Sequence, residues 1–120
     1  MSTIARLAGI AVAASLGLAT PAFAHAHLKV SEPAAGSTVS SPDEIDLTFS
    51  EEVNLKFTGV TLAGPDGATV PLEDAMLMDD EKMLLVPVSG TLAPGVYTVA
   101  WHALSTDGHK TNGTYTFTVK

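Results

Sequence analysis

The chain of 120 residues contains no cysteine, which excludes disulfide bonds, structural zinc on sulfur ligands and thiolate catalysis. Basic residues are few: six lysines and arginines against thirteen acids leave a formal charge of −7, which argues against a nucleic-acid partner. With 6% aromatic residues there is little flat surface for binding carbohydrate. Of all residues, 46% are hydrophobic and 16% are charged. This composition and the length are typical of one small globular domain.

The first 24 residues have the order of a secretory signal peptide. Arg6 supplies a basic start, residues 7–18 are apolar or small, and Ala22-Phe23-Ala24 is an A-x-A cleavage site. The apolar run is too short to cross the roughly 30 Å of a bilayer, so we expect removal rather than anchoring. The mature domain would be 25–120, periplasmic, not membrane-spanning, with a formal charge of −8 after loss of Arg6. A second A-x-A, residues 24–26, would instead start it at His27.

Short alternating apolar runs, and no helical periodicity, follow the signal. We expect strands at 28–30, 45–49, 53–62, 70–72, 83–88, 97–103 and 115–119, separated by turn residues. About seven strands in one domain predict an all-β fold, a small antiparallel β-sandwich or barrel. Segment 72–82 fits least well and is expected to be a loop or a helical turn. Met83 is expected in the core, and His102 on the solvent side of its strand, opposite Trp101.

Two histidines lie at the expected mature N-terminus. His25 offers its α-amine and ring nitrogen as a chelate, and His27 adds a third nitrogen. Nitrogen-rich ligand sets with a carboxylate suit Cu(II). The alternative is that a signal cleavage site happens to precede a histidine.

Asp107-Gly108-His109 is a second candidate. Residues i and i+2 of an extended segment project to one side, so the carboxylate and the imidazole can converge, and Ser105 and Thr106 can support the loop. Asp-Gly also occurs in turns that need no function. Three weaker candidates are Glu51, as a further carboxylate, and Met76 and Met78, as thioether ligands for Cu(I) or as hydrophobic residues covering a loop.

Catalytic motifs are missing. The sequence has no G-x-S-x-G, no H-E-x-x-H and no glycine-rich phosphate loop. The acids at 79–81 read as a solvated charged run. We therefore expect a protein that is not an enzyme.

The whole mature chain resembles the CopC family of periplasmic copper-binding proteins. The segments that carry the resemblance are HAHL at 25–28, SEPAAGS at 31–37, IDLTFSE at 45–51, LAPGVYTVAW at 92–101, STDGH at 105–109 and GTYTFTV at 113–119. The resemblance implies a Greek-key, immunoglobulin-like sandwich that binds one Cu(II) per chain. It also implies the site residues His25, His27, Asp107 and His109, and a CopD-type inner-membrane partner.

The resemblance further bears on the weaker ligands and on function. Some family members use a glutamate where Glu51 stands, but His27 makes that role weaker here. Some carry a methionine-rich Cu(I) site in a loop that here reads Gly64-Pro65-Asp66-Gly67 and has no methionine cluster. We therefore expect no second metal site. The expected function is that of a Cu(II) carrier or buffer, and the expected state is a monomer. Two alternatives are an N-terminal-histidine copper oxidase of lytic polysaccharide monooxygenase type, and an immunoglobulin-like adhesion module with incidental histidines.

Overall fold

The computed structural model describes residues 26–120. The expected signal peptide, 1–24, and the candidate ligand His25 lie outside the described residues. The strands are β1 (Leu28–Glu32), β2 (Thr38–Val39), β3 (Glu44–Phe49), β4 (Gly59–Ala63), β5 (Thr69–Val70), β6 (Met76–Met78), β7 (Met83–Pro87), β8 (Gly95–Leu104) and β9 (Lys110–Val119), with a 3-10 turn, η1 (Leu55–Phe57).

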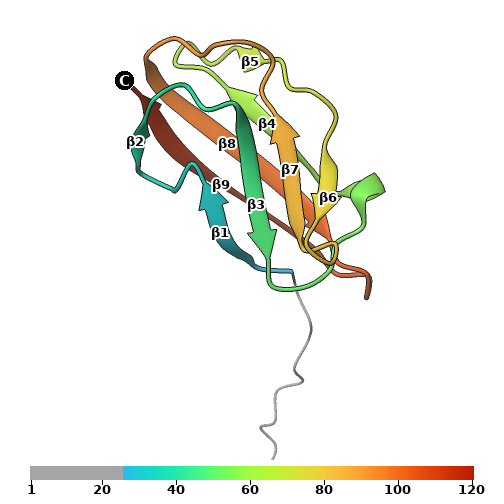
Figure 1. Cartoon of the computed structure of the whole chain (residues 1–120). Coiled ribbons are helices and arrows are strands. Elements are labelled where there is room, and N and C mark those ends of the chain that lie inside the picture. The colour runs from blue at the N-terminus through green and yellow to red at the C-terminus, as the bar shows by residue number, and fades with distance from the viewer. Residues whose placement is uncertain (1–25) are drawn as a thin grey trace, which may run out of the picture.

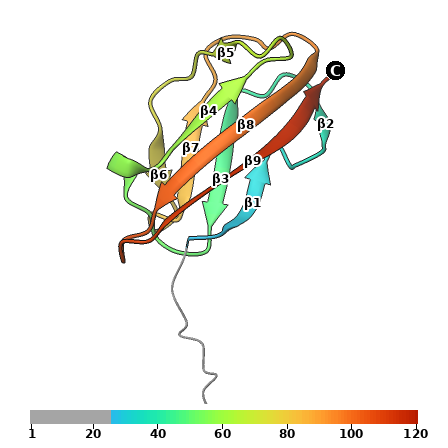
Figure 2. The same cartoon turned by 180° about the vertical axis from the view of Figure 1, so that it is seen from behind.

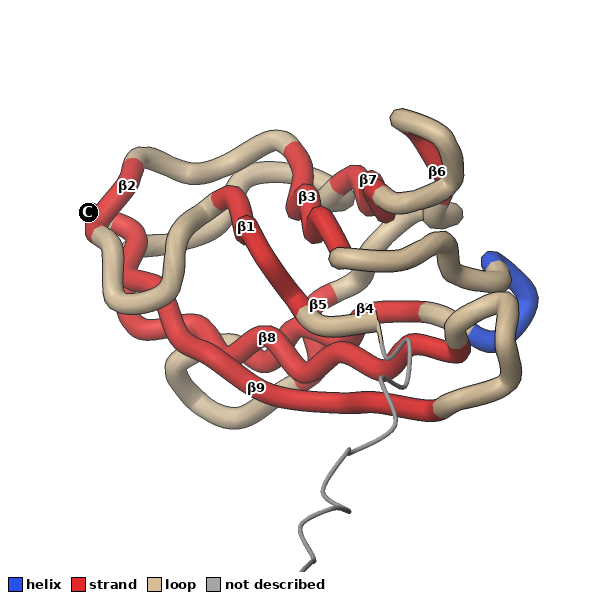
Figure 3. The backbone as a smooth tube through the Cα atoms, turned by 90° about the horizontal axis from the view of Figure 1, so that it is seen from below, coloured by secondary structure: helices blue, strands red, loops and turns tan. Residues whose placement is uncertain are grey.

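These strands form two sheets stacked face to face, and the β-sandwich prediction is confirmed (Figures 1 and 2). One sheet has the order β1-β3-β7-β6 and the other β2-β9-β8-β4-β5; every pairing is antiparallel except that of β2 with β9. The end-on view separates the layers, with β1, β3, β7 and β6 over β4, β8 and β9 (Figure 3). Within residues 26–120, no helix is long and apolar enough to cross a membrane.

Alternating side chains fill the space between the sheets. Ile45, Leu47 and Phe49 of β3 are fully buried, and Val99 of β8 and Phe117 of β9 meet them from the other sheet. Each such side chain contributes about 1.5–3 kcal/mol by leaving water, so this core can hold the domain without disulfides. The prediction for β8 is also confirmed, because His102 is exposed on the outer face.

The expected strand at 53–62 is interrupted. Val53 forms an isolated bridge with Ser105, η1 follows, and β4 begins at Gly59. The side chain of Asn54 accepts a hydrogen bond from the backbone N–H of Lys56 at 2.9 Å, which stabilises the turn in place of a strand.

The expectation of a loop or helical turn at 72–82 is wrong in part, because β6 pairs with β7 there. The connecting residues Asp79, Asp80 and Glu81 all have left-handed backbone, with φ of 51°, 57° and 64°. Met83 is half-buried and opposite Met78, on the strand face away from the buried Leu84, so its expected core position is wrong too.

Candidate metal centre

The first described residues are tied to one end of the sandwich. Ala26 is completely buried, and its carbonyl accepts a hydrogen bond from Thr111 Oγ1 at 2.8 Å. The N–H of His27 donates to Ser50 Oγ at 2.9 Å, and the carbonyl of His27 accepts from the N–H of Ser50 at 2.8 Å. The backbone is thus held from two elements, while His27 as a whole is exposed.

The connection between β8 and β9 forms a compact loop at the same end. Ser105, which is 2% exposed, donates its N–H to the carbonyl of His109 at 2.9 Å. Gly108, with φ of 98°, occupies the left-handed conformation that favours glycine, and its N–H returns to Ser105 O at 2.9 Å. The N–H of Thr106 donates to the carbonyl of Glu52 at 3.1 Å, so the loop is also fixed to the chain that follows β3.

Asp107 and His109 contact each other within this loop. Nδ1 of His109 lies 3.1 Å from Oδ1 of Asp107, and the N–H of His109 donates to the same oxygen at 3.3 Å. The Ser105 hydroxyl also donates to Oδ1. These hydrogen bonds, first that of Ser105 and then that of the His109 ring, hold the pKa of Asp107 below its ordinary value. The carboxylate therefore stays ionised at neutral pH beside a half-exposed imidazole.

This pair can serve a metal in two ways. A carboxylate that accepts from Nδ1 fixes the ring and raises the basicity of Nε2, as in many histidine metal sites. The three contacts described above share Oδ1, so Oδ2 lies outside them and suits direct coordination of a hard cation or Cu(II).

Of the three weaker candidates, only Glu51 lies at the same end of the sandwich as His27. Glu51 is half-buried and follows Ser50, so it lies at the same end as His27, whereas Met76 and Met78 are exposed on β6. Within residues 26–120, no three histidine or acid side chains are close enough together to hold a metal ion. The structure joins Asp107 to His109 and puts the His27 backbone at the same end, but the two rings and the Asp107 carboxylate do not form one cluster.

Sequence reasoning did not identify Ser50 and Thr111, which hold this end together. Neither has a local signal, because each bonds to a residue far along the chain. The supporting role expected of Ser105 is confirmed, and Thr106 contributes through its backbone.

The sequence model of the CopC domain matches residues 28–120. The chain belongs to the CopC family. Protein YobA of Escherichia coli K12 is 46% identical over 106 residues, which cover 86% of each chain. Copper resistance protein C of Escherichia coli is 40% identical over 113 residues, 88% of this CopC chain and 89% of the relative.

A solved structure agrees with the family assignment. The crystal structure of PcoC, described as a methionine-rich copper resistance protein from Escherichia coli, matches this CopC chain with a TM-score of 0.73 at 37% identity. The match covers 81% of this chain and all of PcoC. The immunoglobulin-like sandwich expected from the resemblance is therefore the family fold.

Proposed function

We propose that this CopC-family chain is an exported carrier or buffer of Cu(II) that binds one ion per molecule and serves copper resistance or supply. Its ligands are the α-amine and ring of His25, the ring of His27, and the side chains of Asp107 and His109. The observation that carries the proposal is the convergence of the N-terminal segment and the Asp107–His109 loop at one end of the sandwich.

The hydrogen-bonded anchor at Ala26 supports a role for the N-terminus. Because consecutive Cα atoms are about 3.8 Å apart, a residue joined directly to Ala26 cannot leave this end of the domain. If the signal peptide is cut after Ala24, the new α-amine belongs to that residue. The amine and an imidazole together form a chelate that binds Cu(II) more tightly than most other divalent metals.

The Asp107–His109 pair supports the same ion. Its ionised carboxylate adds negative charge, and the contact with Nδ1 orients the imidazole before metal arrives. Metal binding therefore costs little side-chain conformational entropy. Relatives named copper resistance protein C make copper the natural cargo. Four or five nitrogen and oxygen ligands would leave no open position, which favours carriage over catalysis.

We further propose that the mature domain works in the periplasm as a monomer. It would exchange copper with a membrane partner of the CopD type. The signal-like first 24 residues and the family resemblance support this placement.

The test is a Cu(II) titration of protein purified from the export compartment, with the N-terminus read by intact mass. We expect a chain that starts at His25, one tight Cu(II) and a nitrogen-rich tetragonal EPR spectrum. Asp107→Ala and His109→Ala should each weaken binding by roughly tenfold or more. Asp66→Ala, in a turn at another connection, is the matched control and should bind as the unchanged protein does.

A second arm tests the N-terminus and the absence of turnover. One extra residue before His25 should abolish the amine–imidazole chelate, while Asp107 and His109 remain. Equal affinity of the extended chain would refute the N-terminal ligand set, and no stoichiometric copper would refute the function. Peroxide release from ascorbate and oxygen would instead indicate a copper oxidase.

A further inference from the structure

The two outer faces of the sandwich differ in charge. On the four-stranded sheet, β1 and β3 direct the carboxylates of Glu32, Glu44 and Asp46 outward. On the five-stranded sheet, the outward positions of β4, β8 and β9 carry no acid at all; they are Gly59, Thr61, Ala63, Val96, Thr98, Ala100, His102, Leu104, Lys110, Asn112, Thr114, Thr116 and Thr118. In a chain with thirteen acids, this neutral to basic face is a departure from the rest of the surface.

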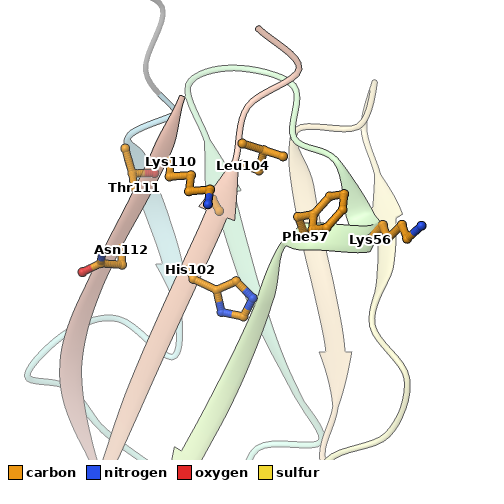
Figure 4. A pocket seen from close by; sticks show the side chains of 8 residues that line it. Lys56, Phe57, His102, Leu104, Lys110, Thr111 and Asn112 are labelled. Atoms are coloured by element: carbon orange, nitrogen blue, oxygen red, sulfur yellow. The ribbon is translucent and has the colours of Figure 1, made fainter. Parts of the chain in front are cut away.

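A pocket of about 340 Å³ opens at one end of this face. Lys110 and Asn112 of β9 line one side, Phe57 and Lys56 of η1 the other, and His102 of β8 lies between them (Figure 4). The His102 ring rests on Gly59, where a Cβ atom would come within 3.1 Å of its Cε1. The floor is therefore formed by a ring that packs closely on the glycine backbone and would have to give by a few tenths of an ångström to admit a Cβ atom.

An exposed aromatic side chain lines the same pocket. Phe57 is 51% exposed, whereas Leu55 of η1, 42% exposed, lines a separate pocket. The ammonium of Lys56 lies 5.7 Å from the centroid of the Phe57 ring, so positive charge and an aromatic face are presented together. Aromatic side chains such as Phe are enriched at protein interfaces, so the exposed Phe57 ring suits contact with a partner.

The pocket adjoins the candidate metal centre along the chain. Leu104 immediately precedes Ser105, and Lys110 immediately follows His109. A partner seated in the pocket would thus contact both strands that hold the Asp107–His109 loop (Figure 4).

We propose that this basic pocket, made of Lys56, Phe57, His102, Leu104, Lys110 and Asn112, is a docking site for an acidic segment of a partner protein that also carries an apolar side chain. Carboxylates of the segment pair with Lys56 and Lys110, and its apolar side chain packs on Phe57. That this partner exchanges copper with the neighbouring site rests on the proposed function.

Charge complementarity selects this occupant. The pocket has two of the five lysines of the mature chain and no lining carboxylate, so an acidic segment gains attraction there and is repelled elsewhere on a surface of charge −8. A second copy of the chain is the competing occupant, because its own acidic turn at 79–81 has the required charge.

The experiment is an NMR titration of the metal-free, ¹⁵N-labelled mature chain. The probe is a synthetic acetylated hexapeptide of the sequence Glu-Asp-Phe-Glu-Asp-Leu, and its neutral counterpart has Gln and Asn in place of the acids. We expect amide shifts concentrated at 56–57, 102–104 and 110–112 with the acidic peptide only. The double variant Lys56→Glu/Lys110→Glu should weaken binding about tenfold or more.

The matched control is Lys29→Glu/Lys82→Glu, which makes the same change of net charge on β1 and before β7. It should weaken binding far less. Equal weakening in both double variants, equal shifts with the neutral peptide, or no shifts at millimolar peptide would overturn the proposal. A dimer in sedimentation equilibrium that the Lys56→Glu/Lys110→Glu variant disrupts would make the pocket a self-interface and overturn it as well.

Two further measurements keep the outcomes separate. Thermal unfolding checks that the variants fold, and if the glutamate variant does not, Lys56→Gln/Lys110→Gln replaces it with the same expected direction. Because the titration uses metal-free protein, it does not depend on copper. A Cu(II) titration of the double variant should still give one ion per chain, so failure of docking and failure of the metal site are distinguishable.

Discussion

Asp46 is an outward carboxylate placed among other carboxylates. Glu32 is its cross-strand partner on β1, and Glu44 lies two residues away on the same face of β3. Burial, a hydrogen bond with Glu44 and the charges of Glu44 and Glu32 together raise the pKa of Asp46 from 3.8 to about 7. The folded state therefore binds this proton more tightly than the unfolded chain does.

The first prediction concerns pH. Between about pH 4 and pH 7 the folded chain holds one more proton at Asp46 than the unfolded chain, so the free energy of unfolding should fall as the pH rises across this range. Asp46→Asn should flatten that fall, because its amide does not titrate. Urea unfolding of metal-free protein at several pH values measures the slope. Asp43→Asn, an exposed position before β3, is the control, and an unchanged slope in Asp46→Asn would contradict the assignment.

The second prediction concerns Ser105. Its hydroxyl is the main reason that the pKa of Asp107 is low, so Ser105→Ala should raise that pKa toward its ordinary value. The measurement is a ¹³C NMR titration of the Asp107 carboxyl in metal-free protein. Thr106→Ala is the matched control, because the hydrogen bond of Thr106 to Glu52 uses its backbone. The same pKa in Ser105→Ala and the unchanged chain would remove Ser105 from this role.

At the scale of elements, the β8–β9 pair is the longest ladder, and one glycine determines how it packs. Gly113 lies opposite Trp101, whose ring also meets Phe49 edge-on at 5.4 Å and 64°. A Cβ atom at Gly113 would lie 2.9 Å from Cζ2 of Trp101. The indole therefore lies directly on the glycine backbone, between the two sheets.

The third prediction follows from this contact. Gly113→Ala should lower the free energy of unfolding by about 1–3 kcal/mol, because the ring has to move in a filled core. The sign is informative, since alanine in place of glycine within a strand would otherwise stabilise it. Urea unfolding measures the change against Thr114→Ala, the next residue, which is exposed. A stabilised Gly113→Ala variant would show that the indole relaxes without cost.

Elements with strict alternation were predictable from sequence, and others were not. Residues 45–49, 97–103 and 115–119 alternate because each strand has one face in the core. The turn η1 was missed because residues 53–62 are apolar enough for a strand. Asn54, the N-cap that begins η1, competes with the strand through a hydrogen bond to the backbone two residues on. β2 was missed because its two residues are ordered only by pairing with Thr118 and Val119 of β9.

At the scale of the whole molecule, charge is unevenly distributed. The described acids gather on the four-stranded sheet and in the turns, and the outer face of the five-stranded sheet has none. With a formal charge of −8 for residues 25–120, the folded state bears self-repulsion that the expanded chain relieves.

The fourth prediction is a stabilising effect of salt. Raising NaCl from about 0.02 to about 0.5 M shortens the Debye length to a few ångströms, which screens the repulsion. The midpoint of thermal unfolding of metal-free protein should therefore rise. Calorimetry at fixed pH tests this, and a midpoint that falls with salt would mean that favourable ion pairs outweigh the repulsion.

The candidate site was predictable only in its local part. The spacing of Asp107 and His109 predicted that their side chains could meet, and the contact at 3.1 Å confirms it. The position of the N-terminal segment depends on Thr111 and Ser50, which are distant in sequence and carry no motif. The ligand roles of His25, His27, Asp107 and His109 all stay predictions.

Trp101 is the only tryptophan of the chain, and it lies on β8 four residues before Ser105. Its fluorescence therefore comes from one known position between the sheets. Unfolding would shift that emission as water reaches the indole, and a paramagnetic ion bound at the end of β8 would quench it without unfolding. The spectrum of a single natural fluorophore thus separates loss of the fold from arrival of metal, with no label added to the protein.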